Sequence, residues 1–144
     1  MEIDLKLIKI RDIVENYKDN AEEGVVGYGG KLNIRPAYQR EFVYKPEQRN
    51  EVIKTIMRGY PQTSFPLNVM YWAQNAENQY ELIDGQQRTI SICQFYTYGF
   101  SIDINGLPKN FDNLSPTQME YFLNYEIQVY ICSGTPEEKL EWFS

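Results

Sequence analysis

The chain has 144 residues, 42% hydrophobic and 24% charged, which is the composition of a single folded domain with a core. Its net charge of −6 argues against a stand-alone binder of duplex DNA, because such domains are usually basic. It contains no histidine, so acid–base chemistry would fall to carboxylates, lysine, tyrosine or cysteine. No apolar run approaches the roughly 20 residues of a membrane helix, and the charged start is unlike a signal peptide. We therefore expect no membrane association and a cytoplasmic protein.

The first half of the chain predicts alternating strands and helices. Alternating apolar residues predict a short strand over residues 3–7, and apolar residues at helical spacing predict a helix over roughly 10–18. Glycines within 24–30 predict a loop or hairpin tip, although their spacing fails the nucleotide-binding glycine patterns. A short strand is predicted over 31–34, and a helix from Pro46 to about Arg58.

A hairpin and a buried helix follow. Strands are predicted over 67–72 and 79–83, separated by a polar turn over 73–78. A buried helix over roughly 87–98 comes next and ends at Gly99.

The last part of the chain contains two helix-start signals. A strand over 100–104 precedes the segment Ser115-Pro116-Thr117-Gln118, a capping box that predicts a helix to about Leu123. A strand over 125–131 leads to a second capping box at 135–138. These elements together predict one α+β domain over residues 1–144, with short helices packed around a small mixed sheet. Because the last predicted helix has barely begun at Ser144, we expect this chain to be the N-terminal part of a longer protein cut within a helix.

The segment Asp84-Gly85-Gln86-Gln87-Arg88, here called the second motif, lies between a strand-like and a helix-like run. Gly85 permits a sharp turn because it lacks a Cβ. Arg88 falls in the first helical turn, where free N–H groups carry partial positive charge and attract anions such as phosphate. The alternative is an exposed polar turn in which Arg88 pairs with Asp84.

Cations and aromatic side chains also gather between Arg35 and Lys45. The guanidinium fork of arginine suits phosphate oxygens, and tyrosine can stack on a base. An alternative is that Phe42, Val43 and Tyr44 fill the core while the charges face water. Composition does not decide between the two.

The two clusters occur in the order of a known family. Arg-Pro-x-Tyr-Gln-Arg-x-Phe-Val-Tyr at 35–44 is followed by Arg-Gly-Tyr-Pro at 58–61 and Ile-Asp-Gly-Gln-Gln-Arg-Thr at 83–89. This set resembles the N-terminal domain of the GmrSD type IV restriction enzymes, in the ParB/sulfiredoxin-like superfamily, over roughly residues 5–144. The family usually carries Ile-Pro where this chain has Arg35-Pro36, and Trp at the position of Tyr44.

The resemblance implies an α+β ParB/sulfiredoxin-like fold and a nucleotide-handling domain of bacterial defence. Relatives hydrolyse nucleoside triphosphates and usually carry a nuclease domain further along the chain. Tyr38, Gln39 and Arg40 match the family's first motif, and residues 84–88 match its second. The resemblance implies that nucleotide and phosphate are bound by Tyr38, Gln39, Arg40, Gly85, Gln86 and Arg88.

We assign roles at this site from chemistry. Arg40 and Arg88 would bind phosphate oxygens, and the catalytic set would be Asp84, Gln87 and Arg88. Asp84 would hold Mg²⁺ or orient a water, because magnesium prefers a carboxylate together with substrate phosphates. Gln86 and Gln87 would position that water or a nucleotide edge, and Tyr38 would stack on a base.

The leading functional hypothesis is Mg²⁺-dependent binding and hydrolysis of a nucleoside triphosphate that regulates a restriction or antiphage nuclease. That nuclease would lie in the same chain or in a partner subunit, and DNA would be contacted through the full-length protein. The first alternative is a ParB-like DNA-binding or nuclease domain acting directly on modified DNA. The second is a domain that no longer catalyses and only assembles partners.

Overall fold

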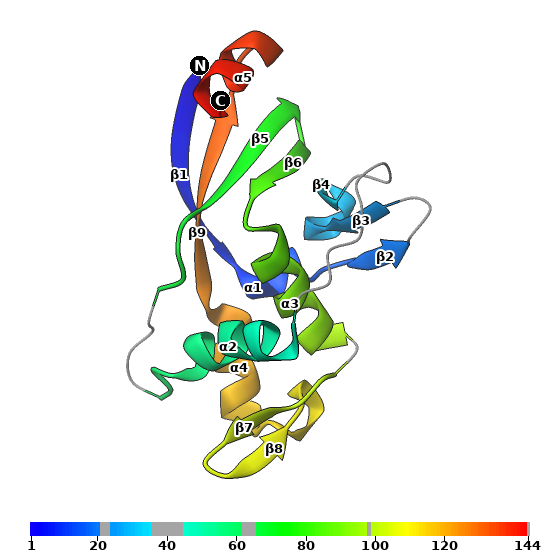
Figure 1. Ribbon diagram of the computed structural model, residues 1–144, viewed down its shortest axis with the longest axis vertical. Helices are drawn as coiled ribbons and strands as arrows, with labels where there is room; N and C mark the ends of the chain where they lie inside the picture. Colours follow the sequence, from blue (N-terminus) through cyan, green and yellow to red (C-terminus); the bar gives the residue numbers. More distant parts are fainter. Residues whose placement is uncertain (21–23, 36–44, 62–65, 98, 144) are drawn as a thin grey trace.

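A mixed sheet of seven strands forms the centre of the molecule, in the order β1-β9-β5-β6-β4-β3-β2 (Figure 1). The computed structural model describes residues 1–20, 24–35, 45–61, 66–97 and 99–143. The strands of the sheet are β1 Glu2–Lys9, β2 Lys18–Asn20, β3 Gly24–Gly27, β4 Leu32–Arg35, β5 Met70–Ala76, β6 Gln79–Asp84 and β9 Glu126–Ser133.

Five helices accompany the sheet within these ranges. They are α1 Ile10–Ile13, α2 Pro46–Met57, α3 Gln86–Thr97, α4 Pro116–Asn124 and α5 Pro136–Phe143. Two 3₁₀ turns, η1 Tyr28–Gly30 and η2 Phe111–Asn113, and a small hairpin of β7 Ile102–Ile104 and β8 Leu107–Lys109 complete the described elements. None of these helices is both long and apolar enough to cross a membrane.

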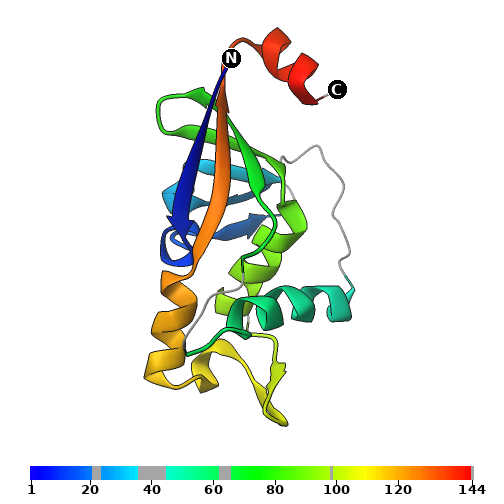
Figure 2. The same cartoon turned by 90° about the vertical axis from the view of Figure 1, so that its left-hand side faces the viewer.

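The elements are distributed along the long axis of the molecule. Helices α2 and α4 and the β7–β8 hairpin lie at one end, and α5 lies at the other end beside the N-terminus (Figures 1 and 2). The sheet is mixed because β5 pairs with β9 in parallel and with β6 in antiparallel orientation, while β4 pairs with β6 in parallel. The predicted α+β class, with a mixed sheet and short helices, is therefore confirmed.

The core lies where one face of the sheet meets the helices. Ile127, Val129 and Ile131 of β9 are buried together, as their alternation predicts. The apolar face predicted for the 46–58 helix is also buried, at Val52, Ile53, Ile56 and Met57. Phe95 of α3 contacts Phe122 of α4, with ring centroids 5.4 Å apart, and so joins the two helices.

The helix predicted over 10–18 is wrong beyond Ile13. α1 has only four residues, Asn16 takes a φ of 57°, and β2 begins at Lys18. The apolar spacing that suggested a longer helix is real, because Ile10, Ile13 and Val14 are all buried. These side chains reach the core from a single turn and the bend after it.

The loop predicted over 24–30 is wrong in its first half. Gly24–Gly27 is strand β3, paired with both β2 and β4, and only Tyr28–Gly30 forms a turn. A Cβ on Gly27 would lie 2.8 Å from the backbone oxygen of Ile13. Here glycine allows two backbone segments to approach closely, rather than giving a loop its freedom.

The hairpin prediction is correct in type and shifted in its limits. β5 starts at Met70 rather than 67 and extends to Ala76, so the turn shortens to Glu77 and Asn78.

Both predicted capping boxes are confirmed. In α4 the Ser115 N–H donates to Gln118 Oε1 at 2.9 Å and the Gln118 N–H donates to Ser115 Oγ at 3.2 Å. Strand β8 was not predicted; it pairs with β7 across the Asn105-Gly106 dipeptide, which is typical of hairpin turns.

Candidate functional site

The second motif forms the turn between β6 and α3. β6 ends at Asp84, Gly85 takes a φ of 108°, and α3 begins at Gln86. A Cβ on Gly85 would lie 2.7 Å from Cγ of Met70, so this position has room only for glycine. Thr89 closes the first helical turn, since its N–H and its hydroxyl both donate to the Gly85 oxygen, at 2.9 and 2.8 Å. The motif therefore sits on a rigid strand-to-helix connection.

Asp84 and Arg88 lie side by side on this turn. Arg88 Nη2 is 3.5 Å from Asp84 Oδ2, and Arg88 Nη1 donates to the backbone oxygen of Asn68. The Arg88 side chain is 19% exposed and the Asp84 side chain 64% exposed. The guanidinium is thus anchored and largely enclosed, while the carboxylate remains open to solvent. The ion pair expected from the polar-turn alternative exists, and because its carboxylate is open to solvent, we expect the pair to contribute little stability.

The two glutamines of the motif are both half-buried. Oε1 of Gln87 is enclosed and has no hydrogen-bond partner among the described residues. The backbone oxygen of Gln87 accepts from Ser91 Oγ at 2.7 Å, which holds this part of α3 in place. An enclosed acceptor without a partner is rare in folded proteins and fits a donor such as a bound water or a ligand.

A hollow of about 440 Å³ lies between α2 and Arg88. Helix α2 contributes Glu47, Gln48, Glu51 and Val52, and Leu67 lines the hollow from the segment before β5. A volume of this size lies within the range of small-molecule sites. Figure 2 shows α2 lying across α3 near this region. Of the second motif, Arg88 is the residue that lines this hollow among the described residues, while Asp84, Gln86 and Gln87 are not in its lining.

The first motif cannot be placed against this hollow. Tyr38, Gln39 and Arg40 lie outside the described residues, and so do Phe42, Val43 and Tyr44. Whether Arg40 and Arg88 share a site stays a prediction.

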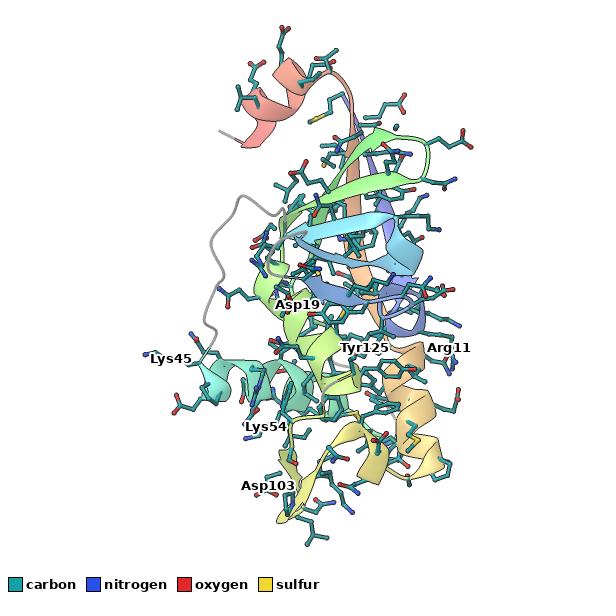
Figure 3. The ribbon with its side chains drawn as sticks, turned by 90° about the vertical axis from the view of Figure 1, so that its right-hand side faces the viewer. Arg11, Asp19, Lys45, Lys54, Asp103 and Tyr125 are labelled. Carbon is teal, nitrogen blue, oxygen red and sulfur yellow. The ribbon has the colours of Figure 1, made fainter. Side chains whose placement is uncertain are left out.

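The two ends of the cationic segment are described. Arg35 is only 4% exposed, and its Nη2 lies 3.5 Å from Oδ1 of Asp19, a residue labelled in Figure 3. Arg35 is therefore buried and forms an ion pair with Asp19 of β2, the edge strand of the sheet. Lys45 is exposed at the start of α2 (Figure 3).

Tyr125 holds the segment before β5 in place through a hydrogen bond, a role that sequence reasoning did not identify. Its hydroxyl accepts from the Leu67 N–H at 2.9 Å, and burial raises the pKa of this phenol. Leu67 lines the hollow and the neighbouring Asn68 oxygen holds Arg88, so Tyr125 fixes the segment that orients the guanidinium. No local pattern signals this contact, because the partners are 58 positions apart.

The second motif contains one carboxylate, Asp84, that could bind a magnesium ion. Within the described ranges no group of three His, Cys, Asp or Glu side chains is arranged to hold a metal ion. Asp84 alone, exposed beside a hollow, fits the usual magnesium arrangement of one or two carboxylates completed by substrate phosphates and water. The residues present are therefore compatible with a metal that arrives with a phosphate ligand.

Cys93 is not a nucleophile for this site. It lies on α3, fully buried, and burial raises the pKa of its thiol. Only the thiolate is reactive, so this thiol is chemically inert in the folded chain.

A second hollow of about 410 Å³ lies on another side of α2, next to β7 and α4. Its lining includes Lys54 and Asp103, which Figure 3 shows near one another, and contains no second-motif residue in the part of the chain that is described. The motif therefore points to the hollow beside Arg88.

The chain is thus an α+β domain with a glycine-dependent strand-to-helix turn, an anchored arginine and a hollow beside that arginine. The family model described as GmrSD restriction endonuclease, N-terminal domain, matches residues 10–143. The chain belongs to this family, as the resemblance of its motifs predicted. Neither a curated protein nor a solved structure matches it.

Proposed function

We propose that this domain binds a nucleoside triphosphate with Mg²⁺ beside the second motif and hydrolyses it, and thereby regulates a nuclease of a restriction system. The carrying observation is Arg88, anchored next to Asp84 at the start of α3 and lining a hollow of about 440 Å³. Membership of a restriction endonuclease family supplies the context.

The phosphates are best placed against Arg88. The guanidinium is oriented by the Asn68 oxygen, so its remaining donors are aimed without further ordering. Arg88 lies in the first turn of α3, at the positive end of the helix dipole. An anion bound there would be stabilised both by the guanidinium charge and by the helix dipole. Only Asp84 offsets this positive charge within ion-pair distance in the described part of the chain.

Asp84 and Gln87 are the groups suited to the reaction itself. Asp84 is exposed enough to reach a metal ion or a water that a phosphate brings with it. When bound, magnesium would neutralise phosphate charge as it develops in phosphoryl transfer. Gln87 is assigned to orient the attacking water, because its amide oxygen can accept a hydrogen bond. That oxygen is enclosed in this structure, so the side chain would have to turn toward the ligand to do so.

The alternative of direct action on DNA has less support. The net charge is −6, and the hollow has carboxylates at Glu47 and Glu51. A DNA-contacting surface normally gathers cations along the backbone path. Contact with DNA would then come from the full-length protein, through a nuclease domain in the same chain or a partner subunit.

Asp84→Asn tests the catalytic assignment. We expect nucleotide hydrolysis by the full-length protein to fall at least ~100-fold, which is about 2.7 kcal/mol of barrier. The melting temperature should hardly change, because the Asp84 carboxylate is exposed and screened by solvent, and such pairs contribute about 0–1 kcal/mol. Turnover and melting are measured on one preparation. Glu120→Gln is the matched control, since it removes a carboxylate from an exposed ion pair with Arg11, 2.8 Å long and away from the motif.

Binding is tested separately by titration calorimetry with the four common nucleoside triphosphates and Mg²⁺. Arg88→Ala should weaken binding about tenfold or more, because a charge-assisted contact contributes about 1.5–3 kcal/mol. Normal turnover in folded Asp84→Asn protein would sink the catalytic role. If no nucleotide produces heat on titration, the nucleotide-binding proposal is wrong. A DNA affinity that falls steeply with salt concentration would favour direct action on DNA.

A further inference from the structure

The hollow beside Arg88 has walls of opposite charge. Arg88 enters from α3, whereas α2 contributes Glu47 and Glu51, which are one helical turn apart and so share a face. This inference rests on the proposed nucleotide binding. A triphosphate is attracted to Arg88 and repelled by the α2 wall, so the nucleoside part of the ligand must lie against α2.

Most polar groups on the α2 wall already have partners. Gln48 Oε1 accepts from the Lys45 N–H at 3.3 Å, and Glu51 pairs with Arg58 at 3.1 Å. The Thr55 hydroxyl donates to the Glu51 backbone oxygen at 2.8 Å. Glu47 differs from them: it is exposed to solvent, and no hydrogen bond or ion pair of its carboxylate is found among the described residues. Its place in the first turn of α2 favours the helix, but that effect does not require it to line a hollow.

The chemistry of Glu47 selects its partner. An ionised carboxylate only accepts hydrogen bonds, and its two oxygens can take two donors at once. A ribose offers two neighbouring hydroxyls whichever base it carries, and acidic residues bind ribose hydroxyls in other nucleotide sites. Val52 and Leu67 give the same hollow apolar surface for the nucleoside.

We infer that Glu47 binds the ribose hydroxyls of the nucleotide, so that the site selects ribonucleotides over deoxyribonucleotides. Removing the 2′-hydroxyl from the ligand would leave one oxygen of Glu47 without its donor. A site built to hydrogen-bond a substrate hydroxyl rejects analogues that lack it.

The test compares ATP with 2′-deoxy-ATP, each with Mg²⁺, by titration calorimetry on the full-length protein. Tripolyphosphate serves as a ligand without a nucleoside. We expect the unmodified protein to bind ATP about tenfold or more tightly than 2′-deoxy-ATP. In Glu47→Ala this ratio should fall toward one, with the affinity for tripolyphosphate not reduced. Glu77→Ala is the control, since Glu77 is an exposed carboxylate at the far tip of the β5–β6 hairpin.

Two results would overturn the ribose assignment while nucleotide binding stands. One is an equal affinity of the unmodified protein for ATP and 2′-deoxy-ATP, or a ratio unchanged by Glu47→Ala. The other is a loss of discrimination between GTP and ITP in Glu47→Ala, which would show that Glu47 reads the amino group of a base. If the unmodified protein binds neither nucleotide nor tripolyphosphate, the proposed function itself fails.

Discussion

Neighbouring residues of the second motif have different physical roles. Gly85 makes the turn possible, Arg88 is anchored by the Asn68 oxygen, and Asp84 is left open to solvent. Of these three residues, Arg88 and Asp84 are the ones with charged side chains, and Gly85 has none. A change at Gly85 should therefore act through stability, whereas a change at Asp84 should act through chemistry.

Gly85→Ala tests this division. The new Cβ would be held at a φ of 108° and would lie 2.7 Å from Cγ of Met70. We expect a loss of about 2–4 kcal/mol in the free energy of unfolding, from backbone strain together with overpacking. Gly30→Ala is the matched control, because Gly30 has a φ of 89° and open space around it. That variant should lose only about 1–2 kcal/mol. Equal losses in urea titrations of the two would show that the contact with Met70 is not felt.

Helices α4 and α5 begin where their own capping signals place them. The capping boxes before α4 and α5 are both made, the second through Thr135 and Glu138 at 3.1 and 3.2 Å. Each box depends only on side chains within four consecutive residues, so tertiary context does not alter it. Two predictions were wrong, the long helix after Ile10 and the glycine loop. Both concern segments whose backbone pairs with other strands of the sheet.

Ser115→Ala measures the contribution of one such signal. Loss of the hydroxyl leaves the Gln118 N–H without its acceptor, at present 3.2 Å away. We expect the free energy of unfolding to fall by about 1 kcal/mol, observed as a lower denaturation midpoint with an unchanged slope. Ser101→Ala, at an exposed position outside any helix, should have almost no effect. A similar loss in both variants would argue against the capping role.

At the scale of the whole molecule, the sheet and its helices enclose both thiols. Cys93 lies on α3 and Cys132 on β9, each is fully buried, and neither forms a disulfide bond. Burial raises the pKa of the Cys93 thiol in the folded state. The unfolded chain therefore loses this proton first, and stability should decline as the pH rises above about 8.5, the ordinary pKa of cysteine.

Thiol labelling measures how well the folded chain protects its two cysteines. In the native protein at neutral pH we expect a thiol reagent to react with neither cysteine at an appreciable rate, since both are buried and only the thiolate attacks. Both should react at once in denaturant. Cys132→Ala isolates Cys93. Fast labelling of Cys93 in that variant, without unfolding, would reveal local opening of α3.

The sequence by itself determined the local features. It predicted the first strand, the hairpin, the 46–58 helix, both capping boxes and the family. It also offered the pairing of Asp84 with Arg88 as an alternative, and that pair is present. These features depend on periodicity, turn chemistry and neighbours within a few positions, all of which can be read along the chain.

Tertiary structure alone decided which distant groups meet. It placed β4 parallel to β6, paired Arg35 with Asp19, and brought Glu47, Leu67 and the Asn68 oxygen to Arg88. Such contacts depend on closing long loops and packing whole elements, and no short pattern encodes those steps. The motif therefore predicted the neighbouring Asp84 and Arg88 side chains, while the hollow beside Arg88 exists only because α2 packs beside α3.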